Sequence, residues 1–144
     1  MQIDHIGIAC ADAAQFLELY CTLMNGNIGQ KTKYEEMGLD STFINFNDTK
    51  IELLEPFETN SVISKFLDQR GNGLHHISFK VENIEAFYDR INKTGHEFLH
   101  EIRTIHEINK VKKYTFLSLR VSNNIMIEVF EEIIKNEGNA YEKL

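Results

Sequence analysis

The pattern of apolar and polar positions in the first half of the chain predicts a succession of strands and helices. The opening segment IDHIGIAC has strand character. AAQFLELYCTLMNG follows, with apolar residues at helical spacing, Asp12 as the candidate N-cap and Gly26 as the stop. GLDSTFINF and KIELLEP predict two strands joined by the turn residues NDT, and SVISKFLDQR predicts a short helix.

The same order of elements begins again at residue 73. GLHHISFKV predicts a strand, and NIEAFYDRINKTG predicts a helix with Asn83 as its N-cap, Gly95 as its end and an apolar stripe along one side. KKYTFLSLRVSNNIMIEVFE predicts two further strands around a polar turn. The final segment, EEIIKNEGNAYEKL, is compatible with either a short packed helix or a frayed end.

The two halves align with each other residue by residue. DHIGIACADAAQF matches HHISFKVENIEAF without a gap, so that His5 falls on His76, and TFINF matches TFLSL. In the IE pairs that follow, Glu52 falls on Glu128. These matches indicate an internal duplication of a strand, a helix and three strands, a βαβββ module.

The duplication determines the predicted fold class. One module alone cannot bury both faces of its sheet, and 144 residues suit one compact domain. We therefore predict an α+β fold in which residues 1–144 form a single domain, made of a module at 1–70 and a module at 71–135.

The net charge of the chain limits the kinds of molecule that we expect the protein to bind. A net charge of −7 argues against nucleic acid and anionic membranes, because those partners attract clustered lysine and arginine. No apolar run approaches the roughly 20 residues that cross a bilayer, and no signal-peptide pattern follows Met1, so we expect a cytoplasmic protein.

Cys10 and Cys21 are too few for a disulfide framework, and we expect two small buried or half-buried thiols.

The duplication also selects one of two adjacent histidines. Neighbouring side chains on a strand point to opposite faces, so His75 and His76 cannot both face one site. His76 has a symmetric partner in His5, and we predict that His75 points the other way. A pseudo-twofold relation between the modules would place His5, His76, Glu52 and Glu128 around a shared cleft.

These four side chains predict a metal site. Two imidazoles and two carboxylates without a thiolate suit a divalent first-row metal, with water or substrate oxygens in the remaining positions. Each glutamate is flanked by apolar residues, and a buried carboxylate without a partner is costly. A place on the solvated face of a strand is the alternative for a single glutamate, but it does not account for a matched pair beside matched histidines.

The same segments resemble the vicinal oxygen chelate superfamily, which includes glyoxalase I, extradiol dioxygenases and methylmalonyl-CoA epimerases. The likeness is greatest to the epimerases. It is carried by IDHIGIAC, by NDTKIELLEP followed by SVISKFLDQRGNGLHHISFKVENIEAF, and by IMIEVFE. The resemblance implies a glyoxalase-like fold, in which paired βαβββ modules form an open, cup-shaped mixed sheet around a metal site, and it implies a homodimer.

The resemblance further implies a ligand set and a reaction. The metal ligands would be His5, Glu52, His76 and Glu128. The cofactor would be one divalent metal ion, with cobalt preferred and manganese, nickel, zinc or iron also compatible with these donors. The ion would stabilise the enolate that forms when a proton α to a carbonyl leaves, and Glu52 or Glu128 would act as the catalytic base.

Two features of the chain depart from the epimerases. Ser41 stands where some epimerases have a glutamate proposed as one of two proton-transferring bases, and serine needs its own activator to serve as a base. The family's glycine-rich loop near the substrate is replaced by EINKVKKYTFLSLR. Lys110, Lys112 and Lys113 in this segment either attract an anionic substrate or protect the edge of a hairpin.

The predicted function is that of a metal-dependent epimerase or isomerase. Its substrate would be methylmalonyl-CoA, a related acyl-CoA or another anionic carbonyl compound. One alternative is a glyoxalase I-type lactoylglutathione lyase, and another is a non-catalytic small-molecule-binding protein of the same fold, such as those that sequester antibiotics. An extradiol dioxygenase fits less well, because its site uses two histidines and one carboxylate.

Overall fold

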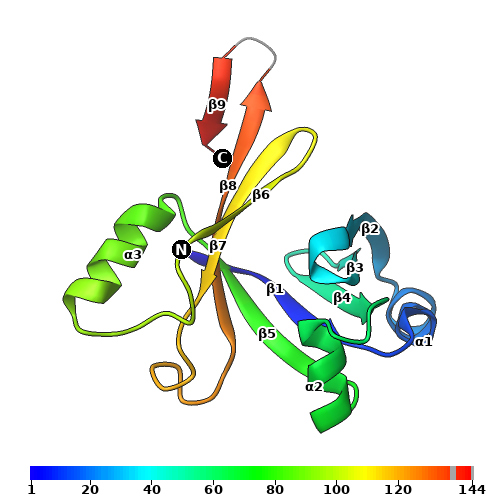
Figure 1. Cartoon of the computed structure of the whole chain (residues 1–144). Helices are drawn as coiled ribbons and strands as arrows, with labels where there is room; N and C mark the ends of the chain where they lie inside the picture. The colour runs from blue at the N-terminus through cyan, green and yellow to red at the C-terminus, as the bar shows by residue number, and fades with distance from the viewer. Residues whose placement is uncertain (137–138, 144) are drawn as a thin grey trace. The chain divides into compact units, whose positions relative to one another are not determined.

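The computed structural model describes residues 1–136 and 139–143 of the chain (Figure 1). The chain divides into two compact units, His5–His76 and Met1–Asp4 together with Ile77–Leu144. Both divisions fall inside strands, namely β1 (Gln2–Ala9) and β5 (Gly73–Lys80). None of the helices in the described residues is long and apolar enough to span a membrane.

The His5–His76 unit contains a sheet with the strand order β2-β3-β4-β1. Neighbouring strands in it are antiparallel, except that β1 and β4 are parallel. After β1 its elements are α1 (Ala13–Leu17), the π-helical turn η1 (Glu18–Leu23), β2 (Asn27–Tyr34), the 3₁₀ turn η2 (Glu35–Met37), β3 (Leu39–Asn45), β4 (Lys50–Pro56) and α2 (Val62–Arg70).

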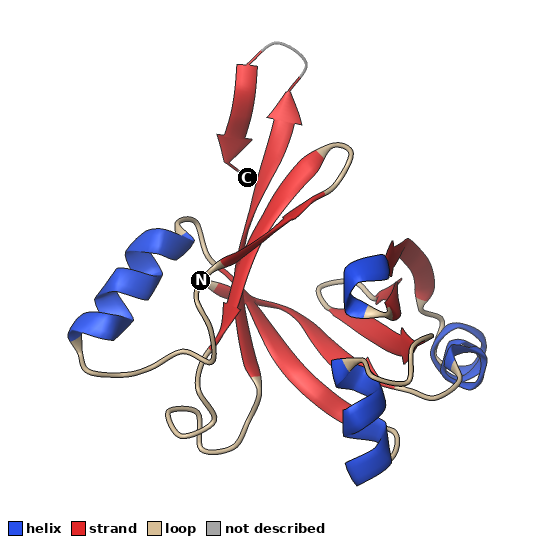
Figure 2. Ribbon diagram, in the orientation of Figure 1, coloured by secondary structure: helices blue, strands red, loops and turns tan. Residues whose placement is uncertain are grey.

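The other unit contains a sheet with the order β5-β8-β7-β6, in which only β5 and β8 are parallel (Figure 2). A further strand, β9, pairs with β8. After β5 its elements are α3 (Ile84–Lys93), β6 (Arg103–His106), β7 (Lys110–Phe116), β8 (Ile127–Asn136) and β9 (Asn139–Lys143).

The predicted α+β fold of two βαβββ modules is confirmed, and the duplication extends to the register of the strands. The glutamate of each IE pair has an equivalent neighbour on each side in the two sheets. Glu52 lies opposite Phe43 on β3 and beside Gly7 on β1, and Glu128 lies opposite Phe116 on β7 and beside Ser78 on β5.

The first helix of each module begins at the predicted N-cap. The side chain of Asp12 accepts a hydrogen bond from the backbone N–H of Ala14 at 2.9 Å, and that of Asn83 accepts one from Ala86 at 2.8 Å. Such a side-chain oxygen satisfies a backbone N–H that has no partner within the helix. The predicted caps of both helices are therefore confirmed.

Each module adds a second acceptor to the same helix start from its last sheet strand. Glu55 on β4 accepts a hydrogen bond from the N–H of Ala13 at 3.0 Å, and Glu131 on β8 accepts one from Ile84 at 2.9 Å. The two glutamates are equivalent, since each lies three residues after the glutamate of its IE pair. A carboxylate at this place also interacts favourably with the helix dipole, so the contact ties the helix to its sheet.

The two cysteines are free thiols, as predicted. Cys10 is fully buried in a core cluster with Ile8, Ile44 and Leu53, and Cys21 is half-buried. Burial, with the nearby carboxylates of Glu55 and Asp12 as smaller causes, raises the pKa of the Cys10 thiol to about 12. Cys10 therefore serves as a small apolar core residue.

Three strands of the structure, β2, β6 and β9, were not predicted from the sequence. β2 and β6 were missed because their sequences, NIGQKTKY and RTIH, are polar and carry little alternation. The final segment forms neither of the two expected structures in its described part: β8 continues to Asn136, and β9 pairs antiparallel with it. Residues 137, 138 and 144 lie outside the described residues.

We expect Glu131→Leu to lower the free energy of unfolding by about 1–3 kcal/mol, because the buried N–H of Ile84 loses its acceptor. Denaturant unfolding checks this, with Glu101→Leu in an exposed position as the control. Equal stability of the two variants would contradict the role of Glu131.

Candidate metal centre

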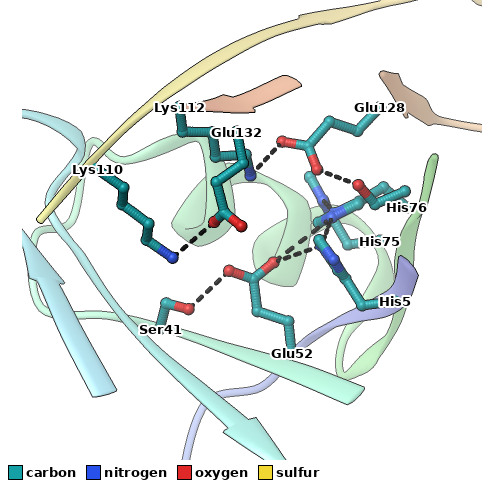
Figure 3. A network of polar contacts seen from close by, with 10 residues as sticks. His5, Ser41, Glu52, His75, His76, Lys110, Lys112, Glu128 and Glu132 are labelled. Carbon is teal, nitrogen blue, oxygen red and sulfur yellow. Dashed lines mark hydrogen bonds and ion pairs between the residues drawn. The ribbon is translucent and has the colours of Figure 1, made fainter. Parts of the chain in front are cut away.

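Three of the four predicted ligands come together inside the His5–His76 unit. Nε2 of His5 lies 3.2 Å from Oε2 of Glu52, and Nε2 of His76 lies 3.5 Å from the same oxygen (Figure 3). The two Nε2 atoms are 3.2 Å apart. All three residues are buried, and one ligand atom from each fits within a span of 4.8 Å. Three donors that converge in this way can hold one metal ion.

The register of the strands explains this convergence. Gly7 and Glu52 are neighbours on the parallel strands β1 and β4, and His5 shares a face with Gly7 because residues two apart on a strand point the same way. The ring of Phe43, opposite Glu52, contacts the His5 ring edge-on at 5.1 Å between centroids. Backbone pairing and one aromatic contact thus orient His5 toward the carboxylate.

Gly7 makes room for the ring of His76. A Cβ atom at this position would overlap the imidazole of His76, since three ring atoms lie within contact distance of it. Only glycine allows the backbone of β1 to approach the ring so closely. This role of Gly7 was not predicted from the sequence, although Gly7 aligns with Ser78 of the other module.

Ser41 contacts the candidate ligand Glu52. Its hydroxyl donates a hydrogen bond of 2.6 Å to Oε1 of Glu52, and both residues are buried. The carboxylate therefore has one oxygen bound to Ser41 and the other facing the two histidines. The residue that stands in place of the expected second base is here a hydrogen-bond donor that orients the candidate ligand Glu52.

His75 does not turn away from His76, so that prediction is wrong. Its Nδ1 atom lies 2.9 Å from Nδ1 of His76. Alternation along a strand fixes only the Cα–Cβ directions, and the side-chain torsions decide where an imidazole ring comes to lie. His75 offers no ligand atom to the group of His5, Glu52 and His76.

Glu128 lies in the other unit, and its role as the fourth ligand stays a prediction. Its carboxylate accepts hydrogen bonds from the hydroxyl of Ser78 at 2.5 Å and from the ammonium group of Lys112 at 2.9 Å. The side chain of Lys112 is 15% exposed and that of Glu128 is 6% exposed, so this ion pair is largely removed from water. Neither donor was predicted from the sequence.

A second ion-pair cluster surrounds Glu132 on the same strand. Lys110 lies 2.7 Å from one oxygen of Glu132, and Lys80 lies 3.4 Å from the other. Burial raises the pKa of the Glu132 carboxyl, but the hydrogen bonds and charges of Lys110 and Lys80 outweigh it, so that the pKa lies below its ordinary value. Lys110 and Lys112 therefore form ion pairs with carboxylates, and they are not unpaired positive charges at the edge of a hairpin.

Comparison with known proteins identifies the superfamily of the chain. Residues 4–113 match the model of the Glyoxalase/Bleomycin resistance protein/Dioxygenase superfamily. The chain belongs to this superfamily. The match includes three of the predicted ligands, and Glu128 lies beyond its end.

The similar members of the superfamily include several epimerases. The chain is 27% identical to the mitochondrial methylmalonyl-CoA epimerase of Homo sapiens over 133 residues, which cover 89% of this chain and 72% of that protein. It is 33% identical to the ethylmalonyl-CoA/methylmalonyl-CoA epimerase of Cereibacter sphaeroides over 95 residues, covering 65% of this chain and 71% of that protein.

Solved structures in the superfamily share the fold. A Streptomyces coelicolor methylmalonyl-CoA epimerase variant in complex with 2-nitronate-propionyl-CoA superimposes with a TM-score of 0.81 at 27% identity, covering 90% of this chain and 93% of that one. A methylmalonyl-CoA epimerase in complex with methylmalonyl-CoA and NH₄⁺ gives the same score and identity, covering 90% of this chain and 92% of the other. These proteins bind acyl-CoA molecules on the scaffold that this chain adopts.

We expect Gly7→Ala to displace the His76 ring and to lower the free energy of unfolding by about 1–3 kcal/mol through overpacking. Gly73→Ala is the matched control, because a Cβ there meets no atom within 4 Å. Denaturant unfolding and the imidazole NMR signals of His76 measure both effects. Unchanged His76 signals in the Gly7 variant would contradict the close approach.

The stability contributed by the Glu132 cluster should depend on pH. Because the folded pKa is lowered, the contribution is complete above the ordinary glutamate value of 4.5 and is lost as the pH falls through the folded pKa. The unfolding free energies of the wild type and Glu132→Gln should therefore differ near neutral pH and converge in acid. A difference that does not change with pH would argue against the ion pairs as its source.

Proposed function

We propose that the protein is a metal-dependent epimerase that removes the proton α to the carbonyl of methylmalonyl-CoA or a related 2-substituted acyl thioester. The observation that carries this proposal is the buried group of His5, Glu52 and His76 in a chain whose relatives are epimerases. We also expect a homodimer, as the resemblance to the superfamily implies, and a cytoplasmic protein, as the sequence pattern predicts.

The residues of the candidate centre fit a divalent first-row metal ion. Two imidazole nitrogens and one carboxylate oxygen converge, and no thiolate is present to favour a closed structural zinc site. Glu128 is the proposed fourth ligand. Cobalt is the proposed ion, although manganese, nickel, zinc and iron accept the same donors. When bound, the ion would supply positive charge that offsets the negative charge developing on the substrate carbonyl as the α-proton leaves.

The proton transfers fall to the carboxylates of the chain. Glu52 or Glu128 is the proposed base, and each carboxylate is oriented by a serine, Ser41 or Ser78. Ser41 directs its own proton toward Glu52, so it is not itself a base for the substrate. A carboxylate held in one orientation loses less entropy when it meets the α-proton.

Proton exchange at C2 of methylmalonyl-CoA in D₂O, followed by NMR, tests the proposal directly. Protein reconstituted with cobalt or with zinc should exchange the proton quickly, and a metal-stripped control should not. Absence of exchange despite bound metal would reject the acyl-thioester substrate. Consumption of the methylglyoxal–glutathione hemithioacetal by the same samples would then favour the lyase alternative.

Replacing a ligand should abolish both metal binding and exchange. We expect Glu128→Ala and His5→Ala to lower the exchange rate by at least about 10²-fold, because each removes a charged or donor group from the reacting site. Glu101→Ala, an exposed position, is the control for both. Full activity of Glu128→Ala would remove Glu128 from the ligand set.

A further inference from the structure

We propose that His75 is a positioning residue that fixes the proton and the orientation of His76, so that Nε2 of His76 is the atom offered to the metal. This inference rests on the proposed metal centre. It starts from the two sides of the His76 ring: Nε2 faces His5 and Glu52, and Nδ1 faces Nδ1 of His75 at 2.9 Å (Figure 3).

The chemistry of imidazole links the two sides of the ring. A neutral histidine carries one proton, and a metal ion takes the lone pair of the nitrogen that lacks it. When Nε2 of His76 binds a metal, its proton is on Nδ1 and requires an acceptor. Nδ1 of His75 is within hydrogen-bond distance, and it accepts the bond when the proton of His75 is on its own Nε2. Two neutral rings that meet through their Nδ1 atoms share one proton, so their tautomers are coupled.

The ring of His75 is itself held by packing within the same unit. It contacts the ring of Phe66 on α2 edge-on, with 5.2 Å between the centroids. The guanidinium group of Arg70 lies over the ring of Phe66 at 5.5 Å. Among the described residues, helix α2 has no counterpart in the second module, so it supplies a support that the duplication alone does not provide. A fixed acceptor is what a ligand histidine needs from its neighbour.

The first module carries an acceptor at the equivalent place in the sequence. Asp4 precedes His5 as His75 precedes His76. Each predicted ligand histidine therefore follows a residue whose side chain can accept a hydrogen bond. An aliphatic residue at either position would lack this ability, although it would suit a strand equally well.

An isosteric pair of variants separates the hydrogen bond from the packing. In His75→Asn the amide oxygen takes the approximate place of Nδ1 and can accept the proton, whereas His75→Leu has a similar volume and no acceptor. Both variants lose the ring contact with Phe66, so they differ mainly in the acceptor. Thermal unfolding of the metal-free proteins establishes that both are folded.

Titration with Co²⁺ measures the consequence in each protein. We expect His75→Leu to bind Co²⁺ about 10- to 100-fold more weakly than the wild type, as for the loss of an outer partner of a ligand histidine, and His75→Asn to recover most of the affinity. In the cobalt-loaded wild type, the hyperfine-shifted Nδ1–H signal of His76 should be visible in H₂O and exchange slowly with solvent. It should remain in His75→Asn and broaden or vanish in His75→Leu.

Each other outcome overturns the inference in a recognisable way. If the wild type binds no Co²⁺, the proposed metal centre fails and the role of His75 fails with it. If the wild type and both variants bind Co²⁺ equally and keep the Nδ1–H signal, the metal centre stands and His75 has no positioning role. If His75→Asn and His75→Leu are weakened equally, His75 acts through its packing on Phe66 and not through the hydrogen bond.

Discussion

The buried carboxylate of Glu52 is the constraint on which the arrangement of the His5–His76 unit depends. A carboxylate removed from water without partners destabilises a fold by several kcal/mol. Here one oxygen is bound by Ser41 and the other faces His5 and His76. These partners come from the separate strands β3, β1 and β5, so Glu52 on β4 keeps them only if these strands hold their register. The polar group therefore specifies the pairing of the sheet as well as the chemistry of the site.

The two modules share one backbone arrangement but differ in the side chains around their equivalent glutamates. In both modules a glutamate follows the isoleucine of the last sheet strand, and a second glutamate three residues later accepts a hydrogen bond from the start of a helix. The surroundings of the first glutamate differ, since Glu52 is bound by Ser41 and Glu128 by Ser78 and Lys112. Equivalent backbone positions thus provide two carboxylates with different partners, which is the condition for giving them different roles.

The contacts of Ser41 and of the lysine-rich segment explain the two departures from the epimerases. Ser41 does not leave a gap where a base was expected, because it orients the carboxylate beside it. The lysine-rich segment that replaces a glycine-rich loop is built into β7, where Lys110 and Lys112 pair with glutamates of β8. In this chain Ser41, Lys110 and Lys112 are all hydrogen-bonded to buried or half-buried carboxylates.

The sequence by itself determined the features that depend on neighbouring residues along the chain. The helix caps at Asp12 and Asn83, the main strands and the duplication follow from local propensity and from spacing, and the alignment of the modules identified the histidines and glutamates of the candidate site. Only the tertiary structure decided which groups contact them. The His76 ring packs closely against the backbone of Gly7, and the His75 ring points toward His76. Both features depend on strand register and side-chain torsions, which no local sequence pattern encodes. β2 and β6 escaped prediction for the same reason, because a polar strand is held by the hydrogen bonds of its neighbours rather than by its own apolar face.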